Sequence, residues 1–218
     1  MVANVGIALA KMGKSTVLVD ASLTTPNLGP LFKLEKVPYT LNDVLAGEIP
    51  LSDAIYSGPH GLRIAPASVV LEHAKKVNPF KLPHVLSTLD ARVDFLIIDA
   101  PGGLRKETVA ALRAGEEVVL VTLPETTSIS NMMRTRVMAE FLGFTPTGII
   151  VNRVLGEEFE FPSAEVKRLL NLPLLGEIPE DINVRKAWRK GEPVLEAYPK
   201  SSASKAIMKL AEKLVKSG

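Results

Sequence analysis

The chain has 218 residues, of which 46% are hydrophobic, and its 26 Lys and Arg against 24 Asp and Glu give a net charge of +2. This length predicts a single domain over residues 1–218, and the near-neutral charge argues against a nucleic-acid partner. Because the sequence contains no cysteine, disulfides, thiolate zinc sites, cysteine-ligated iron–sulfur clusters and cysteine nucleophiles are all excluded.

Targeting and histidine-based metal patterns do not occur either. No run of about 18 uncharged apolar residues and no signal-peptide layout is present, which predicts a soluble, cytoplasmic protein. The three histidines, His60, His73 and His84, lack the spacing of a helical metal pair, so we expect ordinary surface or packing roles for them.

The first part of the chain predicts a buried helix followed by a buried strand. Residues 2–12 are apolar on nearly every face and end at Gly13, and residues 16–20 (TVLVD) form a short strand that closes with Asp20. A polar, proline-broken loop spans residues 21–30. Helices are then predicted at residues 41–46, stopped by Gly47, at 53–56, capped by Ser52, and at 83–89, with a strand at 62–65.

Residues 13–16 spell GKST, which resembles the end of a phosphate-binding P-loop. The first glycine of that motif would fall at Ala8, however, and the segment runs from a helix into a strand, whereas a P-loop runs from a strand into a helix. We therefore expect no nucleotide site here.

The most informative stretch is DFLIIDAPGG at residues 94–103. Its four apolar residues without polar alternation predict a strand buried on both faces, as in a parallel sheet covered by helices. Asp99 stands at the carboxyl end of that strand, where ligands bind in open α/β sheets. A hydrophobic strand ending in Asp before a glycine turn is the Walker B arrangement, in which the carboxylate holds Mg²⁺. The same pattern also fits a buried strand whose terminal Asp caps the next turn.

The rest of the chain continues the alternation of helices and strands. We expect strands at residues 118–122, 148–152 and 174–178, and helices at 107–114, 128–142, 163–170, 184–190 and 204–216. This order predicts an α/β fold with a mostly parallel, doubly wound sheet and helices on both faces. The closing helix has a basic face and an apolar face, which fits core packing better than binding to a membrane surface, because its apolar side carries no Phe or Trp.

Several segments together resemble the MinD/ParA family of deviant-Walker P-loop ATPases, and its archaeal MinD-like members in particular. They are TVLVD at 16–20, LNDVLAGE at 41–48, DFLIIDAPGG at 94–103, VLVTLPETTS at 119–128, GIIVNR at 148–153, LLGEIPED at 174–181 and the final helix. The resemblance covers essentially the whole chain.

The resemblance implies an ATP-driven switch in which two subunits enclose two nucleotides and act on protein partners. It implies ATP/ADP and Mg²⁺ as cofactors, with Asp20 and Asp99 near the metal and Gly102 and Gly103 in the γ-phosphate switch. It also implies Asn152 at the adenine edge. The loop beside the base would be Pro179, Glu180 and Asp181, and Glu125 would lie near the dimer contact.

Three departures from the family pattern bear on activity. The strand and the phosphate-binding loop that precede the first helix in family members are not found, which predicts an N-terminally incomplete domain and a shortened chain. The family's water-activating acid is replaced by Ser22, which cannot accept a proton as a carboxylate does. An Asp often found in the following helix is Asn131.

Two functions from different classes remain open. The first is a MinD/ParA-type dimerising switch, a positioning or maturation factor for a protein client, with impaired nucleotide chemistry. The absence of cysteine argues against an iron–sulfur carrier role. The alternative is a nucleotide-free scaffold that retains the fold and a partner surface. Whether the chain is an enzyme that hydrolyses ATP stays open at this point.

Overall fold

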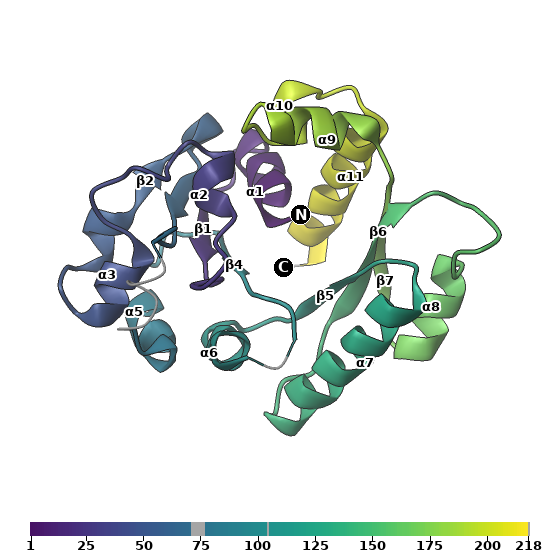
Figure 1. Ribbon diagram of the computed structural model, residues 1–218, viewed down its shortest axis with the longest axis horizontal. Coiled ribbons are helices and arrows are strands. Elements are labelled where there is room, and N and C mark those ends of the chain that lie inside the picture. The colour runs from purple at the N-terminus through teal and green to yellow at the C-terminus, as the bar shows by residue number, and fades with distance from the viewer. Residues whose placement is uncertain (71–76, 104, 218) are drawn as a thin grey trace.

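A computed structural model describes residues 1–70, 77–103 and 105–217 of the chain. The strands form two sheets, one of four strands in the order β2-β3-β1-β4 and one of three strands in the order β5-β6-β7. Helices flank both sheets, and the N-terminal and C-terminal helices occupy the centre of the molecule (Figure 1). The α/β class, the parallel strands and the flanking helices are as the sequence predicts.

The first sheet is built around β1 (Thr16–Asp20), which has the predicted bounds and is buried at every residue. It pairs in parallel with β3 (Arg63–Ala65) and with β4 (Phe95–Asp99). The edge strand β2 (Tyr56–Ser57) runs antiparallel to β3. The helix predicted at residues 53–56 is therefore wrong, because a 3-10 turn at Leu51–Ala54 comes first and pairing of Tyr56 with Ile64 then draws the chain into the sheet.

The second sheet contains β5 (Val119–Thr122), β6 (Gly148–Val154) and β7 (Leu174–Pro179), all parallel. The parallel strands fall into two sheets, because β4 and β5 are edge strands and do not pair with each other. The prediction that the apolar strand before Asp99 is buried on both faces is wrong, because every residue of β4 is only half-buried. In β5, Val121 is 37% exposed. An edge strand without a neighbour leaves its flank open to water.

The helices cover both faces of the strands. Apolar residues of α3, α5 and α6 pack with Val17 and Val19 on one face of the first sheet, and α7 and α8 pack on the second sheet with Ile149 and Val151. The bounds are α2 (Leu28–Leu31), α3 (Leu41–Ala46), α5 (Leu82–Leu86), α6 (Lys106–Ala114), α7 (Thr126–Phe141), α8 (Ser163–Leu170), α9 (Ile182–Arg189) and α10 (Val194–Ala197). Further 3-10 turns lie at Pro59–Gly61 and Pro79–Lys81.

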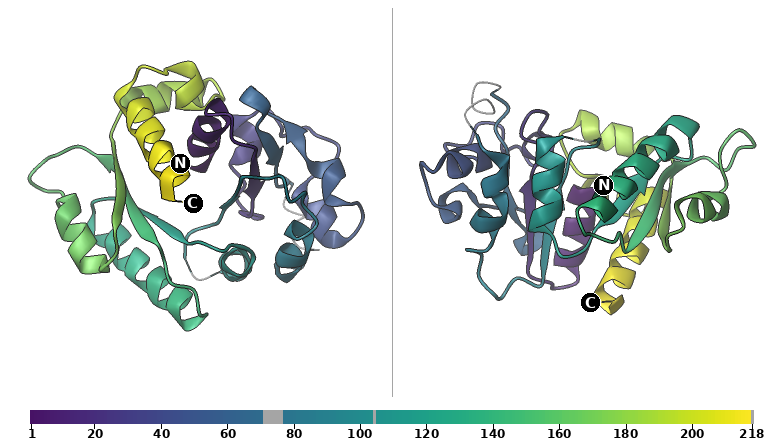
Figure 2. Two further views of the ribbon diagram at one scale, coloured as in Figure 1. Left: turned by 180° about the vertical axis from the view of Figure 1, so that it is seen from behind. Right: turned by 90° about the horizontal axis from the view of Figure 1, so that it is seen from below.

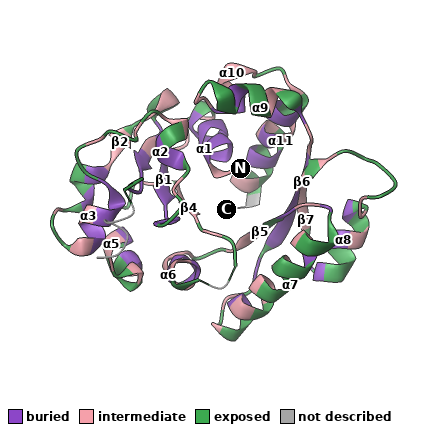
Figure 3. Ribbon diagram, in the orientation of Figure 1, coloured by how far each residue is buried: buried purple, intermediate pink, exposed green. Residues whose placement is uncertain are grey.

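The largest core cluster lies around α1 (Val2–Lys11) and α11 (Ser202–Ser217), which lie side by side (Figures 1 and 2). It includes Leu18 of the first sheet and Ile150 of the second, so the same apolar cluster contacts both sheets. Gly6 lets α1 approach β1 closely, because an added Cβ would lie 2.6 Å from Leu18 Cδ2. Figure 3 shows buried residues along α1, β1 and α11, and also on α3 and in the second sheet.

The closing helix packs in the core, as expected from its sequence. Ile207 and Leu210 of α11 are buried, and Leu214 and Val215 pack against the same cluster. In the part of the chain that the structure describes, no helix combines the length and apolar character needed to cross a bilayer.

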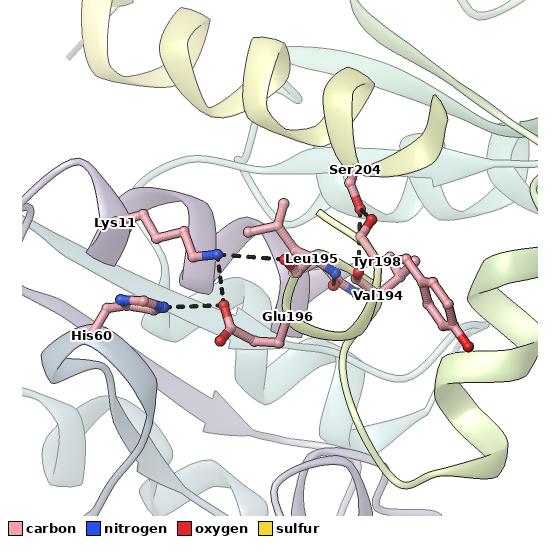
Figure 4. A network of polar contacts seen from close by, with 8 residues as sticks. Lys11, His60, Val194, Leu195, Glu196, Tyr198 and Ser204 are labelled. Carbon is pink, nitrogen blue, oxygen red and sulfur yellow. Dashed lines mark hydrogen bonds and ion pairs between the residues drawn. The ribbon is translucent and has the colours of Figure 1, made fainter. Parts of the chain in front are cut away.

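A polar network ties α1 to α10 and to the turn at Pro59–Gly61 (Figure 4). Lys11 Nζ lies 2.8 Å from Glu196 Oε1 and donates to the Leu195 carbonyl, and His60 Nε2 lies 3.1 Å from the same carboxylate. Burial would raise the pKa of Glu196, but hydrogen bonds from Lys11 and His60 outweigh it and lower the pKa. This network agrees with the ordinary packing role predicted for His60.

Candidate functional site

The carboxyl ends of β1 and β4 place two acids next to each other. In the parallel ladder, Asp20 is the direct partner of Asp99, and both residues end their strands. Neighbouring strands lie about 4.8 Å apart. The resemblance implied that both residues lie near one metal, and the ladder brings them to the same edge of the first sheet.

Asp20 is fully buried, and its carboxylate organises the loop after β1. Oδ1 accepts the Ser22 N–H at 3.1 Å, and Oδ2 accepts the Asn27 and Leu28 N–H groups, both at 3.0 Å. Burial raises the pKa of Asp20 to about 6, with the nearby charge of Asp99 adding to the rise and the backbone N–H groups opposing it. Asp20 therefore shapes the loop at residues 21–28 as well as contributing charge to the site.

The carboxylate of Asp99 has different surroundings from that of Asp20. It is half-buried, and no hydrogen bond to its carboxylate is found within the described residues. Burial raises its pKa, while the α-amino group of Met1 acts in the opposite direction. Two adjacent carboxylates at a strand end suit Mg²⁺, which takes one or two carboxylates and keeps water and phosphate oxygens as its other ligands. The described residues contain no group of three or more acids and histidines that could enclose a metal alone.

The loops after β1 and β4 border this pair. Ser22 is buried, and its neighbour Thr24 accepts a 3.3 Å hydrogen bond from Arg105, which follows the β4 loop. Gly102 and Gly103 are exposed, and an added Cβ at either position would meet no atom within 4 Å from the described residues beyond its chain neighbours. Gly103 has a φ of +83°, a conformation that glycine adopts without strain. These glycines leave their backbone accessible to a charged ligand.

The other predicted site residues lie on the second sheet. Asn152 is half-buried near the end of β6, and within the described residues its side-chain amide makes no hydrogen bond. Pro179 ends β7, and the Glu180 N–H donates to the Val154 carbonyl at 2.9 Å. Glu125 is exposed at the start of α7. The site residues thus form two groups, one on each sheet.

Asp181 is a structural clamp in this fold. Its Oδ1 caps α9 by accepting the Asn183 N–H at 2.8 Å, and its Oδ2 accepts from Ser202 Oγ at 2.8 Å and the Ala203 N–H at 3.1 Å. Burial would raise the pKa of Asp181, but these hydrogen bonds, with a further one from Ser201, lower it to about 2. Its ligand role remains a prediction, while its side chain joins the first turns of α9 and α11.

Arg153 is a residue that the sequence-based assignment did not include. Its Nε lies 2.7 Å from Glu180 Oε2, and its backbone has a φ of 61°. The sequence signal was its place in GIIVNR, directly after Asn152, but nothing in that pattern predicted the ion pair.

The remaining sequence-based assignments concern the GKST segment and the histidines. GKST lies between α1 and β1, in the helix-to-strand order that led us to expect no nucleotide site there. His84 lies on α5, and His73 falls outside the described residues.

Comparison with known proteins supplies the family context. The model of the ParA family, described as NUBPL iron-transfer P-loop NTPase, matches residues 1–215. An uncharacterized ATP-binding protein of Methanocaldococcus jannaschii is 42% identical over 213 residues, which cover 98% of this chain and 81% of that protein.

Two solved structures are also similar. The septum site-determining protein MinD of Pyrococcus horikoshii, complexed with Mg-ADP, superposes with a TM-score of 0.92 at 36% identity, covering 98% of this chain and 88% of that one. MinD in the MinC:MinD cell division complex of Aquifex aeolicus gives 0.86 at 27% identity, covering 99% and 89%.

Proposed function

We propose that this chain, which belongs to the MinD/ParA family of P-loop NTPases, is an ATP-dependent molecular switch that acts on protein partners. The observation that carries the proposal is the pairing of Asp20 with Asp99 at the carboxyl ends of adjacent parallel strands. The similar MinD of Pyrococcus horikoshii is a complex with Mg-ADP, which supports the same ligands for this chain.

Different residues would bind the metal, the phosphates and the base in such a site. Asp99, with Asp20 behind it, would hold Mg²⁺, which neutralises phosphate charge when it is bound. Gly102 and Gly103 offer accessible backbone to the phosphates, and Asn152 offers an amide to the base. Ser22 stands where the family has an acid, so we expect ATP hydrolysis to be slow, because a hydroxyl is a poor general base.

We also infer that one further strand pairs between β4 and β5. The support is that the two sheets end at these strands, and that Phe95 of β4 and Val119 of β5 both pack against the cluster around α1 and α11. Unpaired backbone groups of edge strands favour the addition of a strand.

The proposed mode of action is dimerisation in the cytoplasm, with Glu125 near the contact, and regulation of a protein client. The MinC:MinD complex of Aquifex aeolicus supports a protein partner. A positioning or maturation role agrees with the sequence better than iron transfer, because the chain has no cysteine to carry a cluster.

A second candidate is a nucleotide-free scaffold. It is favoured by the use of both Asp20 oxygens for backbone N–H groups and by Ser22 in place of an acid. A scaffold would need the shape of the loop at residues 21–28 but no metal.

A thermal melt with Mg²⁺ and ATP distinguishes the two candidates. A ligand at 100 times its Kd stabilises the folded state by about 2.7 kcal/mol, which corresponds to a rise of about 5–10 °C in Tm for a chain of this size. The switch predicts such a rise for wild type and its loss in Asp99→Asn, while Asp90→Asn, on an exposed surface ion pair, keeps it. A wild-type Tm that stays constant at millimolar Mg-ATP would favour the scaffold.

A further inference from the structure

The backbone of Arg153 is held in an unusual conformation inside a strand. Its φ is 61°, and the ladder between β6 and β7 shifts register there, with Asn152 opposite Ile178 and Val154 opposite Pro179. This is a β-bulge with a left-handed residue that is not glycine. Such a conformation costs about 1–2 kcal/mol and persists only where the surroundings hold it in place.

Two ion pairs of Glu180 lie beside the bulge. Arg153 Nε lies 2.7 Å from Glu180 Oε2, and Arg185 Nη2 lies 3.5 Å from Oε1 of the same carboxylate. The Glu180 N–H donates to the carbonyl of Val154, the residue after Arg153, at 2.9 Å. Glu180 therefore joins the end of β6 to the loop between β7 and α9 through both its side chain and its backbone.

The side chain of Arg153 also interacts electrostatically with Glu125, the residue before α7. The hydrogen bond to Glu180 raises the pKa of Arg153, and the charges of Glu180 and Glu125 add to the rise. Glu125 precedes α7. The guanidinium therefore lies within the field of two carboxylates that belong to different loops at the same end of the second sheet.

The bulge affects the direction of the Asn152 side chain. An extra residue in a strand re-aims the neighbouring side chains, and Asn152 is the residue directly before Arg153. Its amide makes no hydrogen bond to any described residue. An amide presents one donor and one acceptor side by side, which complements the N6 amino group and N7 of adenine, whereas the corresponding O6 and N7 of guanine are both acceptors.

We propose that Arg153 is a positioning residue whose ion pair with Glu180 fixes the bulge that aims Asn152, and so sets a preference for adenine over guanine nucleotides. The inference rests on the proposed function, since it concerns the base end of the same site. The pair acts through the backbone of β6, so Arg153 itself need not touch the base.

The test compares ATP and GTP binding by calorimetry, with Mg²⁺, for wild type, Arg153→Gly, Glu180→Gln and the double variant. Glycine adopts the left-handed backbone without strain, so Arg153→Gly removes the ion pair while relieving the bulge, and it should fold. We expect wild type to prefer ATP at least tenfold. Either single variant should reduce the ratio of ATP to GTP affinity at least fivefold, and the double variant should reduce it no further, because both remove one pair.

The ratio is the decisive readout, because a general loss of stability lowers the affinity for both nucleotides alike. Arg168→Ala is the matched control: it breaks an exposed ion pair with Glu165 on α8 and should leave the ratio unchanged. Folded Arg153 and Glu180 variants with a wild-type ratio would overturn the role of Arg153 alone, as would a wild type that binds both nucleotides equally. A wild type that binds neither nucleotide would overturn the proposed function as well.

Discussion

Asp20 and Asp99 are direct partners in the parallel ladder of β1 and β4, yet their surroundings differ. Asp20 is fully buried and accepts three backbone N–H groups, whereas no hydrogen bond to the Asp99 carboxylate is found in the described part of the chain. Two adjacent carboxylates repel each other when both are charged, and burial of Asp20 adds a cost for its charged form. The pair is therefore strained at neutral pH unless a cation or a proton neutralises it.

The pKa of Asp20, raised mainly by burial and further by the charge of Asp99, predicts that stability falls as the pH rises through the titration of Asp20. Its pKa is about 6 in the folded chain and 3.8 in the ordinary, solvated state. The folded state thus keeps a proton that the unfolded state has lost, so the stabilisation is complete below pH 3.8 and disappears as the pH passes about 6. A shift of two units corresponds to about 3 kcal/mol.

Urea unfolding between pH 4 and pH 7 measures this effect. Asp20→Asn should flatten the pH profile, while Asp90→Asn on the surface should leave it as in wild type. Mg²⁺ added at pH 7 should raise the stability of wild type and not that of Asp99→Asn. An Asp20→Asn profile as steep as that of wild type would contradict the prediction.

Removing the Asp181 clamp should destabilise the C-terminal helices. Asp181→Asn keeps one acceptor oxygen and replaces the other with an NH2 donor, so it loses either the bond from Asn183 or those from Ser202 and Ala203. A hydrogen bond to a charged group contributes about 1.5–3 kcal/mol. We expect a loss of about 2–4 kcal/mol, measured by urea unfolding at pH 7.

The same clamp has a defined pH range. The pKa of Asp181 is lowered from 3.8 to about 2, so its stabilisation is present above pH 3.8 and is lost as the pH falls toward 2. Wild type and Asp181→Asn should therefore differ in stability at pH 7 and converge at pH 2. Equal stability at pH 7 would show that other contacts hold α9 and α11 together.

Gly6→Ala should destabilise the chain although alanine favours helices. The new Cβ would lie 2.6 Å from Leu18 Cδ2, and overpacking of this kind costs about 1–3 kcal/mol, more than the ~1 kcal/mol gained in helix propensity. Denaturant midpoints measure the difference. Leu18→Val should recover part of the loss in the Gly6→Ala background but destabilise wild type, and a stabilising Gly6→Ala would refute the close packing of α1 on β1.

Backbone amides of β4 and β5 should exchange hydrogen faster than those of β1 and β6. The latter two strands lie between neighbours on both sides, whereas β4 and β5 end their sheets, so about half of their amides lack a ladder partner. Exchange followed by mass spectrometry on peptides covering 95–99 and 119–122, against 16–20 and 148–154, tests this. Equal protection in all four segments would mean that both edges are covered.

Local sequence was sufficient to predict the bounds of helices and strands whose hydrophobic pattern and flanking residues are clear. The strand at 16–20 and the helices at 41–46 and 163–170 were predicted with the bounds that the structure has. In these segments hydrophobic pattern, turn glycines and polar flanks agree with each other. The convergence of Asp20 and Asp99 was also predictable, because parallel strands place their carboxyl ends at one edge.

Contacts between distant segments determined the secondary structure and the hydrogen bonds that the sequence did not predict. Tyr56 joined a strand instead of a helix because Ile64 pairs with it, and the helix at Val194–Ala197 was not predicted because its four residues carry almost no periodic signal. The clamp of Asp181 on Ser202 and Ala203 spans about twenty residues of chain, a separation at which spacing in the sequence carries no information.

The sequence alone thus determined which residues carry charge, where most strands end and the family to which the chain is similar. Tertiary structure alone decided that β4 and β5 end separate sheets and which groups donate to the oxygens of Asp20 and Asp181. It also decided that Arg153 lies in a bulge of β6 and pairs with Glu180. The physical reason is that hydrophobic pattern and turn chemistry act within a few residues, whereas hydrogen-bond partners and ion pairs are chosen only once distant segments are packed together.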